Sequence, residues 1–150
     1  MCALSELLLD PYYRTVVGFG VLIEKEWCKF GFQFAKRQGH GDGQPDSDQH
    51  SPIFLLFLDA IWQIMQQMPD VFEFNELLLL ALADHAHSCR FGTFLCNCVR
   101  EREELELAYR TCPVFGWVLA QVSSCFPSLS LRRIAILSLF DQCIVRCTFL

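Results

Sequence analysis

One cysteine and one arginine in this sequence have the spacing of a phosphate-handling loop. Cys96 and Arg102 enclose five residues, an arrangement in which a thiolate can attack phosphorus while arginine and backbone N–H groups hold the phosphoryl oxygens. That chemistry needs exposed amides and a thiol with a lowered pKa. The enclosed segment contains no glycine, and Glu101, directly before the arginine, would repel a phosphate. We therefore predict that this pair is not catalytic, and we assign no catalytic residue in the chain.

A second group of side chains has the atom types that bind zinc. Its members are His85, His87, Cys89, Cys96 and Cys98. On a helix, His85 and Cys89 share one face while His87 points away, and the group holds no Cys-x2-Cys pair. We expect a histidine-rich helix end with core cysteines, and no metal or other cofactor; a zinc module stays an alternative. Cys143 and Cys147 are expected to be two small buried side chains rather than ligands.

The composition indicates a chain that folds around an apolar core. Of its 150 residues, 53% are apolar, 14 are phenylalanine and only 19% are charged, which excludes intrinsic disorder and coiled coils. The length corresponds to one domain or to part of one. The net charge of −5 argues against a nucleic-acid partner, because such interfaces concentrate basic residues. The apolar content is high for a free-standing domain of this size, so we expect a further packing surface.

The cysteines and the first residues bear on the compartment. Nine cysteines, an odd number without framework spacing, indicate reduced thiols. The first residues lack the basic and apolar regions of a secretory leader, and no stretch reaches the roughly 18 apolar residues of a membrane span. These features predict a cytoplasmic protein.

Punctuating residues and apolar periodicity predict a mainly helical chain. A short apolar segment over 4–9 is followed by expected helices over 15–30, 53–67, 76–85, 99–110 and 131–146, with an exposed loop over 38–50. Thr15, Ser51 and Asn75 are suitable N-caps for three of these helices, and Asp10-Pro11 is a stop signal. The helix over 76–85 is apolar on every face, which predicts a central position.

Six short sequence strings occur along the chain, and their order and spacing together are much more specific than a single short motif. They are Leu8-Leu9-Asp10-Pro11-Tyr12-Tyr13-Arg14-Thr15, Glu24-Lys25-Glu26-Trp27, Gly39-His40-Gly41-Asp42, Ser51-Pro52-Ile53-Phe54-Leu55, Phe72-Glu73-Phe74-Asn75-Glu76 and Ser88-Cys89-Arg90-Phe91-Gly92-Thr93-Phe94-Leu95. Together they resemble the myotubularin phosphoinositide phosphatases over residues 4–117. We therefore expect a C-terminal portion of that phosphatase domain in 1–117 and a divergent apolar tail in 118–150.

The resemblance implies a fold and an activity. The fold is a cysteine-dependent, protein-tyrosine-phosphatase-like α/β domain, of which this chain supplies the mainly helical C-terminal part. The family removes the 3-phosphate from phosphatidylinositol 3-phosphate and phosphatidylinositol 3,5-bisphosphate. Its catalytic Cys-x5-Arg loop should lie before residue 1, so we expect the chain alone to be inactive. The alternative is a regulatory pseudophosphatase that binds active members of the family.

The resemblance also implies partners and a location. The partners are the phosphoinositide headgroup, a membrane surface reached through an N-terminal module outside this chain, and homo- or hetero-dimers within the family. The implied location is cytoplasmic and peripheral to endosomal membranes.

One basic segment resembles the family's substrate-contacting stretch, Gly-His-basic-Phe-x-x-Arg, over residues 31–37. Arg37 matches its second basic position and is the expected substrate-binding residue, because a guanidinium suits bidentate phosphate contact. Gln33 stands at the first basic position and Phe32 at the histidine, so one charge contact is lost. The alternative is that Lys36 and Arg37 are solvated charges at a helix end.

Overall fold

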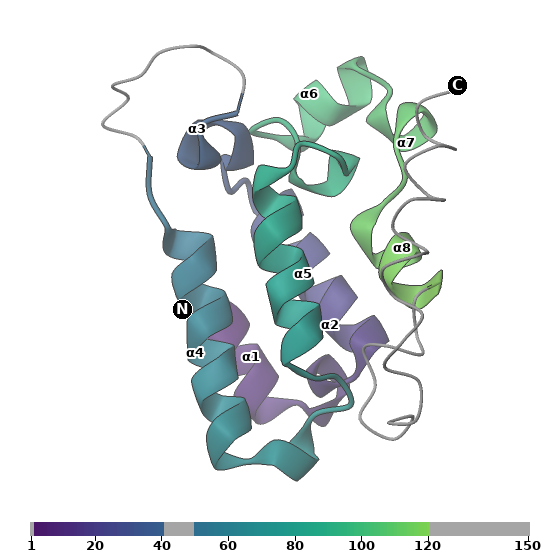
Figure 1. Cartoon of the computed structure of the whole chain (residues 1–150). Helices are drawn as coiled ribbons and strands as arrows, with labels where there is room; N and C mark the ends of the chain where they lie inside the picture. Colours follow the sequence, from purple (N-terminus) through teal and green to yellow (C-terminus); the bar gives the residue numbers. More distant parts are fainter. Residues whose placement is uncertain (1, 41–49, 121–150) are drawn as a thin grey trace.

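The computed structural model of the chain describes residues 2–40 and 50–120, and within these ranges every regular element is a helix (Figure 1). The α-helices are α1 (Cys2–Leu9), α2 (Val16–Ile23), α3 (Phe34–Gln38), α4 (Ile53–Gln67), α5 (Glu76–His87), α6 (Val99–Glu104), α7 (Leu107–Arg110) and α8 (Val114–Ala120). A π-helical turn covers Glu24–Lys29, and 3₁₀ turns cover Pro11–Arg14, Pro69–Val71 and Gly92–Phe94. The expectation of a mainly helical chain is confirmed for these residues. No helix in the described ranges is long and apolar enough to span a bilayer.

Side chains from one of the six strings fix the junction between α1 and α2. Asp10 accepts a hydrogen bond from the N–H of Tyr12 at 2.9 Å and so begins the 3₁₀ turn at the point where the following proline ends α1. The Arg14 guanidinium donates to the carbonyls of Leu7 at 3.0 Å and Leu8 at 2.8 Å. The last carbonyls of α1 therefore have partners, and the predicted stop at this point is confirmed.

Helix α2 begins at the predicted cap. The Thr15 hydroxyl accepts from the N–H of Gly18 at 3.0 Å and donates to the carbonyl of Tyr12 at 2.8 Å. A Cβ at residue 18 would collide with that same Tyr12 carbonyl, so only glycine fits where the first turn of α2 crosses the 3₁₀ turn.

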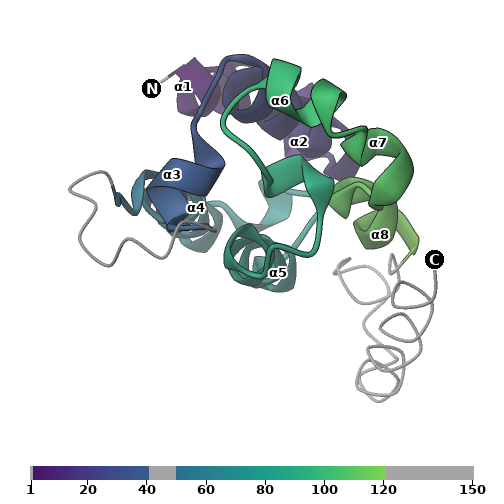
Figure 2. The same ribbon diagram turned by 90° about the horizontal axis from the view of Figure 1, so that it is seen from above.

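Aromatic side chains fill the core between two layers of helices. Figure 2 shows α1 and α2 on one side and the packed pair α4 and α5 on the other. Phe19 from α2 stacks on Phe74 with ring centroids 4.6 Å apart. Phe34 from α3 lies 5.2 Å from Phe54 of α4 and 5.0 Å from Phe94, and all five rings are fully buried. Burial of these rings anchors the short α3 to the core.

The predicted helix over 15–30 changes its winding partway along. It is an α-helix to Ile23, and the turn over Glu24–Lys29 is π-helical, with the N–H of Phe30 bonded to the carbonyl of Lys25 at 3.1 Å. The wider turn lets the neighbouring Trp27 and Cys28 both face inward, with 8% and 5% exposure.

The predicted helix over 99–110 is broken in the structure. Glu106 lies in the left-handed region, with φ of 52°, and separates α6 from α7. The break lets α7 return to the 92–94 turn, where the N–H of Gly92 donates to the Thr111 hydroxyl at 3.1 Å. The i,i+4 ion pair of this stretch joins Arg100 and Glu104 at 2.8 Å.

The capping predictions for α4 and α5 had different outcomes. Asn75 caps α5, accepting from the N–H of Leu77 at 3.1 Å, as predicted. The prediction for Ser51 is wrong, because Pro52 occupies the N-cap position of α4 and no side chain caps this helix.

The central position predicted for α5 is also wrong, since Leu77 and Leu80 are 44% and 62% exposed.

Two predicted features fall on residues outside the described ranges. Most of the expected loop over 38–50 belongs to 41–49, and the expected helix over 131–146 lies beyond Ala120. Helix α8 continues across the predicted boundary between the 1–117 segment and the 118–150 tail, and its Val118 side chain is fully buried.

Candidate functional site

The basic segment that carries Arg37 forms the short helix α3. Its first turn is held by a distant loop: the N–H of Ala35 donates to the Cys96 carbonyl at 3.3 Å, and the N–H of Lys36 donates to Asn97 Oδ1 at 2.9 Å. Gly39, with φ of 73°, ends the helix. The last turn of α3 is therefore presented from a fixed backbone.

The two basic side chains of α3 differ in their exposure. Lys36 is exposed, whereas Arg37 is half-buried. The N–H of Arg37 donates to the Gln33 carbonyl at 2.8 Å, and its carbonyl accepts from the N–H of Ser51 at 3.1 Å. The backbone of Arg37 is thus tied on both sides, and a guanidinium on such a backbone can offer a bidentate contact to a phosphate.

The two departures from the family's basic stretch have different surroundings. Phe32 packs against Trp27 at 4.9 Å and against Phe34 at 4.8 Å between ring centroids, so it joins the aromatic core. The Gln33 side chain is exposed and makes no capping hydrogen bond to α3. The position of Phe32 is therefore used for packing, while that of Gln33 remains open to a ligand.

The Cys96 and Arg102 pair has contacts opposed to nucleophilic chemistry. Arg102 donates from Nε to the Leu95 carbonyl at 2.9 Å and from Nη1 to the Cys28 carbonyl at 3.1 Å. The carboxylate of Glu101 accepts from the N–H of Asn97 at 2.7 Å, at a backbone amide that a phosphate-binding loop would keep free. Burial, assisted by the Glu101 charge, raises the pKa of the Cys96 thiol, which disfavours the thiolate.

The histidine and cysteine group at the end of α5 is spread apart. The His85 ring is buried, with centroids 4.7 Å from Phe91 and 4.9 Å from Trp117, and burial lowers its pKa. His87 is exposed, and its Nδ1 lies 3.1 Å from the Ala83 carbonyl. Across residues 2–40 and 50–120, no three His, Cys, Asp or Glu side chains come together as a metal site. Cys143 and Cys147 lie outside these ranges.

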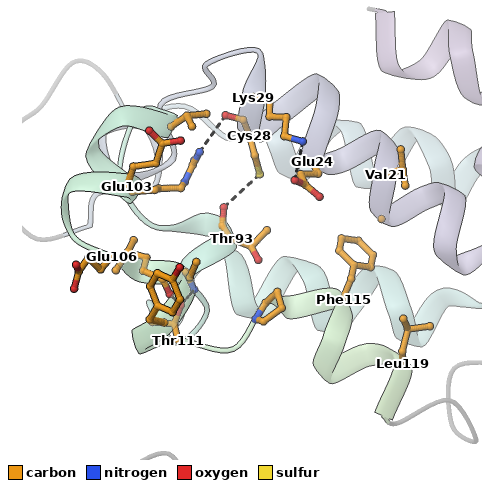
Figure 3. A pocket seen from close by; sticks show the side chains of 18 of the residues that line it. Val21, Glu24, Cys28, Lys29, Thr93, Glu103, Glu106, Thr111, Phe115 and Leu119 are labelled. Atoms are coloured by element: carbon orange, nitrogen blue, oxygen red, sulfur yellow. Dashed lines mark hydrogen bonds and ion pairs between the residues drawn. The ribbon is translucent and has the colours of Figure 1, made fainter.

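A cavity of about 820 Å³ opens between α2 with its π turn and the α6–α8 segment (Figure 3). Val21, Phe115 and Leu119 contribute apolar walls, and Figure 3 shows them along one end. Near the middle of the cavity the Cys28 thiol donates to the Thr93 carbonyl at 3.3 Å. Burial raises the pKa of Cys28 to about 11, so this thiol is not available as a nucleophile near neutral pH.

The sequence predictions missed both this cavity and the contact between Asn97 and α3. The cavity walls come from two distant segments, 16–29 and 92–119, and the Asn97 contact joins residues 61 apart. Periodicity within a short window contains no signal for either feature.

Comparison with known proteins agrees with the six strings. Residues 1–103 match the myotubularin-like phosphatase domain. The chain is 51% identical over 120 residues to the phosphatidylinositol-3,5-bisphosphate 3-phosphatase MTMR6 of Rattus norvegicus, which covers 80% of this chain and 18% of that protein. It is 48% identical over 118 residues to myotubularin of Rattus norvegicus, and this match covers 79% of this chain and 20% of that protein. It is 46% identical over 122 residues to phosphatidylinositol-3,5-bisphosphate 3-phosphatase MTMR2 of Bos taurus, and this match covers 81% of this chain and 19% of that protein. The chain spans about a fifth of the length of these relatives. It belongs to the myotubularin family of phosphatases.

Proposed function

We propose that the chain is the helical C-terminal part of a phosphoinositide 3-phosphatase domain of the protein-tyrosine-phosphatase-like α/β class. Its substrates would be phosphatidylinositol 3-phosphate and phosphatidylinositol 3,5-bisphosphate, at cytoplasmic faces of endosomal membranes. The observation that carries the proposal is the 51% identity, over 120 residues, to the rat enzyme named for the bisphosphate. The membrane-directed module and any dimer partner of the family type would lie outside these residues.

Within such a domain the role we assign to this chain is headgroup contact through Arg37. Its backbone is tied to Gln33 and Ser51, and its planar guanidinium can offer two parallel N–H groups to a phosphate. Lys36 lies beside it on α3 but at a position the family pattern leaves unassigned. The exposed Gln33 supplies no charge, so headgroup affinity depends more heavily on Arg37.

The chain by itself is proposed to be inactive. Cys96 and Arg102 are the sole Cys-x5-Arg match in the 150 residues. The arginine is engaged by two carbonyls, and the thiol has a raised pKa. The nucleophile of the proposed domain must therefore come from residues outside this sequence.

The second candidate function is a regulatory pseudophosphatase that binds active members of the family. The specific observation in its favour is the substitution at the basic stretch, where Phe32 is packed into the core and Gln33 is uncharged. Reading the coding sequence upstream of Met1 separates the two candidates. A Cys-Ser-Asp-Gly-Trp-Asp-Arg segment there would favour the enzyme, and a segment without the cysteine or arginine would favour the regulator.

A segment exchange tests the proposal directly. In rat MTMR6, the residues that match 2–103 are replaced by those of this chain, and the product is called the exchange enzyme. We expect it to hydrolyse soluble short-chain phosphatidylinositol 3-phosphate with a KM raised about tenfold over the parent, because Gln33 lacks a charge. The variant Gln33→Lys in the exchange enzyme should recover most of that loss. A folded exchange enzyme without turnover would count against the enzyme and for the regulator.

A further inference from the structure

Helix α3 has no cap of its own. The side chain of its N-cap residue, Gln33, makes no capping hydrogen bond. We propose that Asn97 is a positioning residue for headgroup binding, which caps α3 from 61 residues away and so holds Arg37 in its binding orientation. The inference rests on the proposed function, since it concerns the same headgroup contact.

The contact has the geometry of an N-cap supplied by another segment. Asn97 Oδ1 accepts from the N–H of Lys36 at 2.9 Å, as a side chain at the N-cap does for an amide of the first turn. The neighbouring carbonyl of Cys96 accepts from the N–H of Ala35 at 3.3 Å. Two successive amide donors at the start of α3 are therefore satisfied by one loop.

Two side chains of α6 form hydrogen bonds to the backbone of that loop. The Glu101 carboxylate accepts from the backbone N–H of Asn97 at 2.7 Å. Arg102 donates to the carbonyl of Leu95 at 2.9 Å and also to that of Cys28 at 3.1 Å. Cys96, which lies between Leu95 and Asn97, has a left-handed backbone conformation, with φ of 64°. The backbone that carries the Asn97 side chain is therefore held in place before any ligand arrives.

Loss of this cap should reach Arg37 because α3 is very short. A five-residue helix has too few internal hydrogen bonds to hold its own first turn. Arg37 follows Lys36 directly, and its N–H bonds to Gln33 within the same turn. If that turn opens, the guanidinium loses the orientation that a bidentate phosphate contact requires.

Headgroup binding by the exchange enzyme tests the inference, with soluble inositol 1,3-bisphosphate as the probe. We expect Asn97→Ala to raise its Kd about fivefold, the effect of losing one N-cap. Asn97→Asp keeps the acceptor oxygen and should restore the affinity to within about twofold of the unsubstituted exchange enzyme. The matched control is Asn75→Ala, which removes an asparagine cap from α5 and should leave the Kd unchanged. Equal effects of Asn97→Ala and Asn75→Ala would overturn the positioning role.

A double substitution separates this inference from the function on which it rests. With Arg37→Ala already present, Asn97→Ala should raise the Kd no further, because the residue through which it acts is gone. A full additional fivefold effect would overturn the inference. If Arg37→Ala alone leaves the Kd unchanged, the assignment of headgroup contact fails. If Arg37→Ala weakens binding and Asn97→Ala does not, only the positioning role fails.

Hydrogen exchange on the 150-residue chain provides a readout that needs no ligand. The N–H of Lys36 should be protected, and Asn97→Ala should remove that protection while Asn97→Asp keeps it. Unchanged protection in Asn97→Ala would overturn the cap itself.

Discussion

The carboxylate of Glu73 accepts a hydrogen bond from the backbone N–H of Val16 at 2.8 Å, joining residues 57 apart in the sequence. The N–H of Glu73 in turn donates to the carbonyl of Arg14 at 3.0 Å. Two of the six family strings, over 8–15 and 72–76, therefore meet at the start of α2. The segments that resemble the family therefore share a structural contact, which fixes the start of α2.

Because of this contact, we expect the folded protein to lose stability when the Glu73 side chain is shortened to alanine. Glu73→Ala should lower the free energy of unfolding by about 1–3 kcal/mol, because an ionised acceptor is removed from a helix N-terminus. Glu73→Gln keeps an acceptor and should lose less. Urea unfolding followed by circular dichroism measures both, with Asp70→Ala as the control, because Asp70 and Glu73 are both exposed carboxylates. Equal values for Glu73→Ala and Asp70→Ala would contradict a structural role.

The crossing at Gly18 predicts a second stability effect. Gly18→Ala should lower the free energy of unfolding by about 3 kcal/mol, because the added Cβ collides with the Tyr12 carbonyl. Gly31→Ala is the matched control: its Cβ meets nothing within 4 Å, and only its φ of 93° opposes a side chain. That substitution should lose about 1 kcal/mol. A Gly18→Ala variant no less stable than Gly31→Ala would contradict the tight crossing.

The buried His85 predicts a loss of stability in mild acid. Burial lowers the pKa of this imidazole below its usual 6.5 in the folded protein, so the unfolded chain binds a proton that the folded chain resists. Its contribution is absent above about pH 6.5 and becomes destabilising as pH falls below that value. His40, whose pKa is also lowered by burial, acts in the same direction.

Urea unfolding at pH 7 and pH 5 measures this effect. The loss of stability between the two should be smaller in His85→Gln than in the unsubstituted chain. An undiminished loss in His85→Gln would assign the pH dependence to other groups.

The isolated chain should show no phosphatase activity. Release of phosphate from phosphatidylinositol 3-phosphate should stay at the buffer level, because Cys96 has a raised thiol pKa and Arg102 is engaged by carbonyls. Cys96→Ser should change nothing. Turnover that disappears in Cys96→Ser would contradict both the geometry and the assignment of the catalytic loop to residues outside the chain.

Local chemistry explains which parts of the fold could be predicted from the sequence. The stop after α1 and the caps by Thr15 and Asn75 involve partners within three residues, so residue type alone indicates them. The cap predicted for Ser51 failed because the proline after it occupies the cap position itself.

Features that depend on distant partners could not be predicted in this way. The break at Glu106 follows from the return of α7 to Gly92, and the cap on α3 comes from Asn97. The place of Arg37 in the family's basic stretch predicts it as a substrate-binding residue. No residue close to α3 in the sequence indicates that Asn97 caps this helix.

The most direct test of the central claim compares two neighbouring cations on α3 in the exchange enzyme. A charge-assisted contact contributes on the order of 1.5–3 kcal/mol, so Arg37→Ala should raise the KM for phosphatidylinositol 3-phosphate tenfold or more. Lys36→Ala, one residue away and more exposed, should change the KM less than about twofold. Equal effects of the two substitutions would reduce the basic segment to non-specific charge attraction and contradict the proposed headgroup contact.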